Sequence, residues 1–161
     1  MITGFNGIGK TTLLKTLIGQ VSPMEGQYKF SEQVVIRYFE QDLAWPDERR
    51  TPIQIVSDNY PNMVIKDVRK HLAQCGISSK HAIQSIGTLS DGEQAKVKMC
   101  LLTLTPCNFL ILDEPTNHLD VQAKESLKLA LYEFPGTVLL VSHEELFYRD
   151  WAQKIINIEK R

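Results

Sequence analysis

The chain has 161 residues, of which 43% are hydrophobic and 23% charged, and its formal net charge is −1. This length suits one globular domain with a buried core. The small net charge gives no general attraction to nucleic acid or to an anionic membrane, and no apolar run approaches the roughly 20 residues that span a bilayer. The cysteines Cys75, Cys100 and Cys107 lack CxxC spacing, which favours a reducing, cytoplasmic location, and Cys100 reads as a core residue.

The first residues contain a phosphate-binding pattern. Residues 4–11 match GxxxxGK[ST], and apolar residues at helical spacing follow as far as residue 18. In such a loop, glycines let backbone N–H groups turn toward phosphate oxygens, the lysine adds a positive charge and the threonine ligates Mg²⁺. The predicted phosphate ligands are Gly4, Asn6, Gly7, Gly9, Lys10, Thr11 and Thr12. A strand should precede this motif, and since only three residues do so, we expect the first strands to be missing.

The next part of the chain changes from strand to short helices. Residues 34–39 form a β-branched strand pattern that ends at Gln41, which fits either a metal or water contact or an exposed loop amide. Helix-like patterns then occupy 53–56, 64–75 and 77–86. We therefore predict a small helical subdomain, residues 46–104, inserted into an α/β core formed by residues 1–45 and 105–161.

A long helix, expected to run to Leu104, opens at Leu89–Gln94. Ser90 and Glu93 have the spacing of a capping box, so this helix start is self-consistent. Its apolar residues cover more than one face, which predicts a largely buried helix. Ser90 and Gly92 at its N-terminus also form a second potential anion site, although the simpler interpretation is a well-capped helix.

Two further strands end in chemically active residues. Residues 108–112 read as a buried strand followed by Asp113 and Glu114, and residues 137–141 as a strand followed by Ser142 and His143. His143 fits a structural or a catalytic role equally. We expect helices at 121–134 and 146–151 and a last strand at 154–158. Because the carboxyl ends of parallel strands meet at one edge of a sheet, these groups should lie together.

Together these residues predict one phosphate, metal and water site. Lys10 and backbone amides would bind phosphates, while Thr11 and Asp113, with Gln41 as a further candidate, would hold Mg²⁺. Glu114 would orient the attacking water or take its proton. Gln41 and His143 would sense or stabilise the γ-phosphate, which makes them the remaining catalytic candidates.

Over nearly its full length, the chain resembles the nucleotide-binding domain of ATP-binding cassette (ABC) proteins. Residues 4–11 match Walker A, Gln41 the Q-loop, residues 89–94 the signature, and residues 109–114 Walker B. The D-loop matches residues 117–120, and the switch histidine is His143. The resemblance implies a P-loop ATPase that binds ATP and Mg²⁺ and pairs head to tail with a second such domain, in the same chain or a homodimer. Ser90 and Gly92 would then act in trans, with Asp120 near the dimer seam.

Within that family the chain looks most like one domain, the second, of an ABC-F protein. The residues that carry this resemblance are 113–120, which read DEPTNHLD, together with Glu93. It implies a cytoplasmic ATPase without membrane spans that acts on the ribosome in translation or antibiotic resistance. One alternative is the ATPase subunit of a membrane transporter, with a permease as partner. Another is a truncated domain that is inactive alone.

Two departures from the family pattern stand out. The second residue of the signature is usually Gly, and here it is Asp91, a carboxylate that would repel a γ-phosphate unless it turns away. The N-terminal strands, with the aromatic residue that stacks on adenine, are absent. Both departures bear on how well this chain binds and hydrolyses nucleotide by itself.

Overall fold

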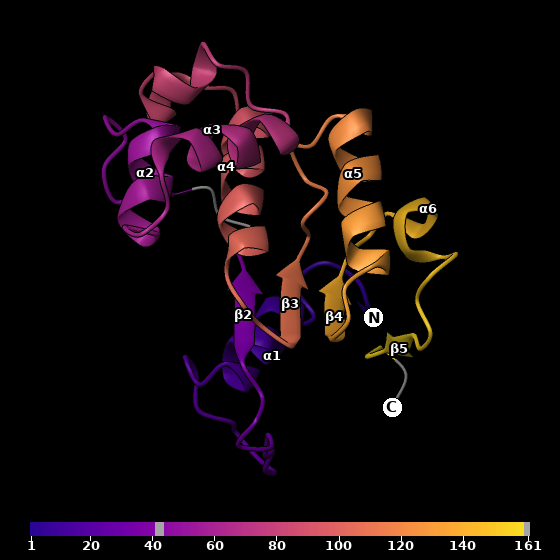
Figure 1. The fold of residues 1–161 in the computed structure, drawn as a ribbon. Helices are drawn as coiled ribbons and strands as arrows, with labels where there is room; N and C mark the ends of the chain where they lie inside the picture. The colour runs from indigo at the N-terminus through magenta and orange to yellow at the C-terminus, as the bar shows by residue number, and fades with distance from the viewer. Residues whose placement is uncertain (41–43, 160–161) are drawn as a thin grey trace. The chain divides into compact units, whose positions relative to one another are not determined.

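The computed structural model describes residues 1–40 and 44–159. Its described part contains a five-stranded sheet in the order β2-β3-β4-β1-β5, and every pairing is parallel. The strands are β1 (Ile2–Thr3), β2 (Ile36–Phe39), β3 (Phe109–Asp113), β4 (Thr137–Val141) and β5 (Ile156–Asn157). Figure 1 shows β2, β3 and β4 as neighbouring arrows that point the same way. The predicted α/β fold with a parallel sheet is confirmed.

Residue contacts divide the chain into two compact units. The sheet unit comprises Met1–Gln41, Pro106–Asn117 and Lys128–Arg161, and the helical unit comprises Asp42–Thr105 and His118–Leu127. The helical subdomain expected from the sequence covers residues 46–104. The assignment of the whole chain to one ABC-type domain stays a prediction.

The sheet unit is built around strand β3. Its residues Leu110, Ile111 and Leu112 are at most 4% exposed, which explains why this strand is a continuous apolar run. Helix α1 (Lys10–Leu17) places Leu14 in the same core cluster as Ile111. Helix α6 (Glu145–Tyr148) is the other described α-helix that lies wholly in this unit. Packing on both faces of β3 thus fixes the end of the strand, where the two carboxylates stand.

The helical unit has its own core. Helices α2 (Pro52–Asn59), α3 (Ile65–Gln74) and α4 (Asp91–Leu104) surround fully buried side chains that include those of Val68, Leu72 and Cys100. The sequence correctly placed Cys100 in a core. Helix α5 (Val121–Tyr132) begins in this unit and ends in the sheet unit.

Two capping boxes start helices of the helical unit. At α2, the Thr51 hydroxyl accepts from the Gln54 N–H, and the Gln54 side-chain oxygen accepts from the Thr51 N–H. At α4, Ser90 and Glu93 are bonded in the same reciprocal way, which confirms the cap predicted from their spacing. The first turn of α4 is therefore held by side chains of its own segment.

Some boundaries differ from those expected. Strand β2 begins at Ile36, two residues late, because the Val35 N–H donates to the Asn108 side chain over 2.7 Å and the regular ladder starts at the pair Ile36 and Phe109. The helix expected over 77–86 consists of two 3₁₀ turns, η1 (His81–Ile83) and η2 (Ile86–Thr88). The last strand is only two residues long.

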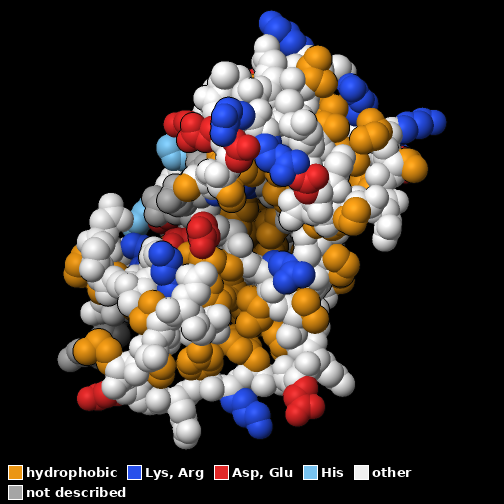
Figure 2. Space-filling model, turned by 90° about the vertical axis from the view of Figure 1, so that its left-hand side faces the viewer, with side chains coloured by type: hydrophobic (Ala, Val, Ile, Leu, Met, Phe, Trp, Pro, Cys, Tyr) orange, Lys and Arg blue, Asp and Glu red, His pale blue; other side chains and the backbone are white. Residues whose placement is uncertain are grey.

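The molecular surface carries mixed charge. On the face shown in Figure 2, basic, acidic and hydrophobic side chains are interspersed, as expected for a net charge of −1. Among the described residues, every helix is too short or too polar to cross a membrane.

Candidate functional site

A cavity of about 540 Å³ lies at the carboxyl ends of the strands in the sheet unit. Most of its lining residues were predicted from the sequence as nucleotide, metal or catalytic residues. The lining consists of Asn6, Gly7, Gly9, Lys10, Thr11, Thr12, Asp113, Glu114, Asn117 and His143. The topology thus gathers side chains from positions more than 100 residues apart into one hollow, as expected for a parallel sheet.

The glycine-rich loop connects β1 to α1. Gly7 and Gly9 have φ values of 86° and 102°, a left-handed conformation that other residues adopt only with strain. Helix α1 begins directly after Gly9, and no side chain caps it. The N–H groups of its first turn therefore remain available for an anion. A phosphate fits such a cradle.

Lys10 is buried, with 7% of its surface exposed. Its ammonium group donates to the carbonyl oxygens of Gly4 over 2.7 Å and of Phe5 over 3.1 Å. The side chain therefore folds back along the loop and lies inside the cavity wall. Gly4 does not line the cavity, and its carbonyl anchors the lysine.

Asp113 is 1% exposed and bonds through one oxygen only. Its Oδ2 accepts from the Thr11 hydroxyl over 2.6 Å and from the Tyr38 hydroxyl over 3.4 Å. Its Oδ1 is buried, and no described residue donates a hydrogen bond to it. A buried carboxylate oxygen without a donor suits a cation. Among the described residues, no group of three or more His, Cys, Asp or Glu side chains is arranged to hold a metal ion. That pattern fits Mg²⁺, which one or two carboxylates hold together with phosphates, better than an all-protein metal cage.

The buried surroundings of Asp113 also change the pKa of the Tyr38 phenol. Desolvation first, and the charge of Asp113 second, raise the pKa of the Tyr38 phenol well above its usual range. The phenol therefore stays protonated and remains a donor to Asp113.

Glu114 sits at a turn directly after β3. Its φ is 47°, and its N–H donates to the Val141 carbonyl over 2.9 Å, so the backbone is left-handed yet tied to the neighbouring strand. Oε2 accepts from the His143 backbone N–H over 3.1 Å. Oε1 lies 3.1 Å from Nε2 of His143, without the geometry of a hydrogen bond. Burial raises the pKa of Glu114, and the charge and backbone N–H of His143 partly oppose that rise.

Other predicted site residues lie elsewhere. Gln41 is outside the described residues. Ser90, Gly92 and Asp120 belong to the helical unit, where Ser90 is exposed and caps α4. Asp120 accepts from the Lys96 ammonium and from the Ala123 N–H, each over 2.7 Å. The Lys96 hydrogen bond is the main cause of its lowered pKa. Within this unit, Asp120 thus stabilises the start of α5.

The signature residues Gly92 and Asp91 both have close neighbours within the helical unit. A Cβ atom on Gly92 would lie 2.7 Å from the His118 carbonyl oxygen, so this position excludes a side chain. His118 itself has a left-handed φ of 67°. Its Nδ1 lies 3.5 Å from Oδ2 of Asp91, so the unusual signature carboxylate is turned toward the His118 ring.

Three polar residues in or beside the site were not among the site residues predicted from the sequence. Tyr38 bonds to Asp113, Asn117 lines the cavity and donates its N–H to the Glu114 carbonyl, and the buried Thr116 hydroxyl has no partner among the described residues. The proximity of Asn117 to Glu114 in sequence was a usable signal. For Tyr38 the signal is the register of β2 against β3, which the sequence does not contain.

A glycine-rich loop between a strand and a helix, beside buried carboxylates at the edge of a parallel sheet, defines a P-loop nucleotide-binding domain. Residues 1–117 match the family model described as ABC transporter. The chain belongs to this family of ATP-binding domains, as its motifs predict, and the family binds and hydrolyses ATP.

Curated relatives include members of the F branch. The chain is 46% identical over 156 residues to the uncharacterized ABC transporter ATP-binding protein YfmM of Bacillus subtilis (strain 168), covering 97% of this chain and 30% of that protein. It is 37% identical over 159 residues to ABC transporter F family member 2 of Arabidopsis thaliana, covering 98% of this chain and 24% of that protein. The chain thus spans less than a third of the length of these relatives.

Solved structures agree with the fold. A chain from the complex of archaeal ribosomal stalk protein aP1 and archaeal ribosome recycling factor aABCE1 matches with a TM-score of 0.77 and 26% identity, over 97% of this chain and 31% of that chain. The resemblance to ABC-F and related ATP-binding domains that the sequence predicted is therefore confirmed.

Proposed function

We propose that this domain hydrolyses ATP with Mg²⁺, using Glu114 as the base that activates water. The observation that carries the proposal is the convergence of Lys10, Thr11, Asp113 and Glu114 on one cavity. An anion cradle, a hydroxyl–carboxylate pair and a second, buried carboxylate are the parts that phosphoryl transfer to water requires.

Two side chains fit the metal. Thr11 and Asp113 are already joined at 2.6 Å, and the second Asp113 oxygen is buried without a donor. When bound, Mg²⁺ would offset the charge on the phosphates. Tyr38 would keep the carboxylate in place through its hydroxyl, which donates to the same Asp113 oxygen as Thr11.

Glu114 suits the role of base for two reasons. Burial raises its pKa, which makes the carboxylate a stronger proton acceptor than an exposed one. The His143 backbone N–H fixes one of its oxygens, and the other faces the His143 ring, whose side chain is 47% exposed. His143 would therefore hold Glu114 in place and offer its remaining surface to the γ-phosphate.

Ser90 and Gly92 would act on a nucleotide bound by a second ABC domain. Ser90 is an exposed helix cap and Gly92 adds no side chain, two features that favour an anion at the N-terminus of α4. Asp91 lies 3.5 Å from Nδ1 of His118, and a protonated His118 would offset the carboxylate that otherwise repels phosphate.

The wider role we propose is that of an ABC-F protein that acts on the ribosome in the cytoplasm, in translation or antibiotic resistance. The support is the similarity to F family members and to a chain of a ribosome recycling complex. The description of the YfmM relative as an ABC transporter ATP-binding protein keeps a second candidate, the ATPase subunit of a membrane transporter.

The decisive experiment is Glu114→Gln in the natural protein. Glutamine keeps the acceptor for the His143 N–H and cannot take a proton. We expect steady-state ATP hydrolysis to fall by at least about 100-fold, the usual contribution of a general base, while ATP affinity is retained. Glu144→Gln, at the residue directly after His143, is the matched control. Normal turnover by the Glu114→Gln protein would exclude Glu114 as the base.

The same variant separates the two wider roles. With ATP retained but not hydrolysed, an ABC-F protein should remain on ribosomes and sediment with them in the presence of ATP. Sedimentation with membranes that contain a permease, and none with ribosomes, would instead favour the transporter subunit.

A further inference from the structure

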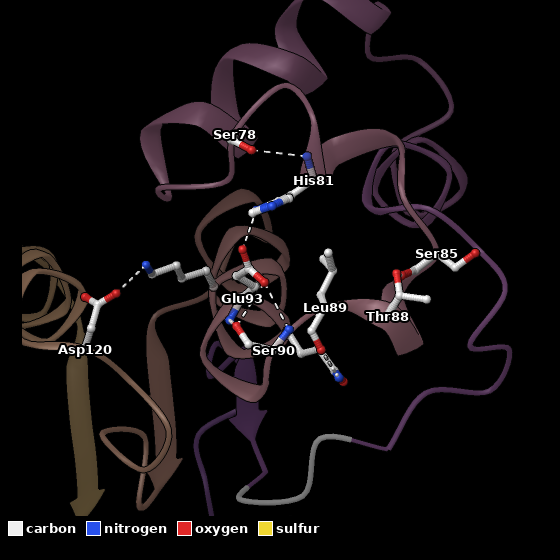
Figure 3. Close-up of polar contacts among 10 residues, drawn as sticks. Ser78, His81, Ser85, Thr88, Leu89, Ser90, Glu93 and Asp120 are labelled. Carbon is white, nitrogen blue, oxygen red and sulfur yellow. Dashed lines mark hydrogen bonds and ion pairs between the residues drawn. The ribbon is translucent and has the colours of Figure 1, made fainter.

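Glu93 joins Ser90 to His81 within the helical unit (Figure 3). The Ser90 hydroxyl donates to Oε2 of Glu93 over 2.9 Å, and the Ser90 N–H donates to the same oxygen over 3.0 Å. The second oxygen, Oε1, forms an ion pair with Nδ1 of His81. A 3₁₀ turn, a helix cap and the first turn of α4 therefore share one chain of polar contacts.

These polar contacts occupy the single proton of the Ser90 hydroxyl. A hydroxyl has one donor, so Ser90 can donate to a phosphate only when its proton turns away from Glu93. A carboxylate 2.9 Å from the hydroxyl oxygen also repels an incoming phosphate. Anion binding at Ser90 therefore depends on the group that contacts the other oxygen of Glu93, both on how firmly it holds the carboxylate and on its charge.

His81 holds Glu93 from the side that faces away from Ser90. Its Nδ1 contacts the Glu93 oxygen that Ser90 does not use, and its backbone N–H donates to the Ser78 hydroxyl over 3.1 Å, which fixes the start of the turn. Although burial acts to raise the pKa of Glu93, the hydrogen bonds from Ser90 and the charges of His81 and Lys96 outweigh it and lower that pKa. Glu93 is therefore ionised, and its negative charge is unfavourable next to a phosphate unless another group offsets it.

We propose that His81 is a positioning residue for Ser90. The inference rests on the proposed function, in which Ser90 binds the γ-phosphate of a nucleotide held by a second ABC domain. His81 keeps Glu93 in place when the Ser90 hydroxyl turns to the phosphate, because its Nδ1 contacts the Glu93 oxygen that Ser90 does not use. His81 itself does not touch the nucleotide.

The test compares His81→Ala with His81→Asn in the natural protein. The asparagine Nδ2 can occupy the place of histidine Nδ1 and donate to Glu93, whereas alanine cannot. For His81→Ala we expect kcat for ATP hydrolysis to fall about fivefold, the size expected when a partly exposed charged contact is lost. His81→Asn should restore most of that loss. The affinity for a fluorescent ATP analogue should not change in either variant, because the P-loop is intact.

His71→Ala is the matched control, since this histidine lies on α3 of the same unit and its side chain forms no hydrogen bond or ion pair among residues 1–40 and 44–159. Equal thermal unfolding of all variants establishes that they fold, which is expected because the His81 side chain is one-third exposed. A His81→Asn protein as slow as His81→Ala, or a His81→Ala protein with normal kcat, would overturn the inference.

Ser90→Ala separates this inference from the function on which it rests. If Ser90→Ala hydrolyses ATP at the normal rate, the proposed role of Ser90 is wrong and the inference falls with it. If Ser90→Ala is slow while His81→Ala is normal, only the inference is wrong. The double variant should be no slower than Ser90→Ala alone, because His81 acts through Ser90; an additional loss of rate would contradict that action.

Discussion

Gly92 is expected to be required for the stability of the helical unit as well as for any contact with a phosphate. In Gly92→Ala, the added Cβ would lie 2.7 Å from the His118 carbonyl oxygen, closer than the 3.0 Å below which such contacts essentially never occur. His118 is already in a left-handed conformation, so its carbonyl cannot easily move away. Overpacking of this kind costs about 1–3 kcal/mol, and the better helix propensity of alanine returns about 0.5–1 kcal/mol. The difference spans about 0–2.5 kcal/mol, and because the close contact is to a backbone oxygen, the expected net loss lies in the upper part, at about 1–2 kcal/mol.

The two tryptophans make this loss measurable for one unit at a time. Trp45 lies in the helical unit and Trp151 in the sheet unit, so a Trp151→Phe background leaves Trp45 as the reporter of the unit that contains Gly92. Urea unfolding followed by Trp45 fluorescence should show the loss of about 1–2 kcal/mol. Thermal unfolding should show a midpoint about 2–8 °C lower.

Thr103→Ala provides the control, since it is an exposed position on the same helix and should change stability by less than about 0.5 kcal/mol. If Gly92→Ala were as stable as the Thr103→Ala control, the close approach of the His118 carbonyl would not be real. The glycine would then have to be explained by ligand binding alone.

Two further predictions concern the sheet unit. Lys10→Ala should weaken binding of a fluorescent ATP analogue about 10- to 100-fold relative to Lys15→Ala, because a charged hydrogen bond contributes about 1.5–3 kcal/mol; equal affinities would exclude Lys10 as a phosphate ligand. Glu114→Gln should raise the thermal midpoint of the chain at pH 8 and do so much less at pH 4. The reason is that a folded-state pKa above the ordinary 4.5 makes stability fall as pH rises through that pKa. The same gain at both pH values would show that Glu114 does not titrate in this way.

Sequence patterns single out the candidate site residues where each residue is marked by its immediate neighbours. Lys10 and Thr11 follow the glycines of their loop, Asp113 and Glu114 end an apolar run, and Ser90 has its capping partner three residues away. These features depend on local geometry, so the chain alone specifies them. The parallel sheet then follows from strands that alternate with helices.

The features that escaped prediction depend on contacts distant in sequence. Tyr38 reaches Asp113 only because β2 pairs with β3 in one register, 75 residues apart. The Asp120 bond to Lys96 and the approach of His118 to Gly92 likewise join segments that no sequence pattern relates. A one-residue change in the register of β2 would have placed the Tyr38 side chain on the other face of the sheet.

The left-handed turn at Glu114 sets a condition for anyone who would build this site into another protein. Consecutive residues of a strand project to opposite faces, yet Asp113 and Glu114 both line one cavity. A Glu114 φ of 47° redirects the second carboxylate, at a strain of roughly 1–2 kcal/mol. The Val141 carbonyl and the His143 N–H hold it there. An Asp-Glu pair grafted onto a designed parallel sheet without that neighbouring strand would leave one carboxylate on each face, and only half of the intended chemistry.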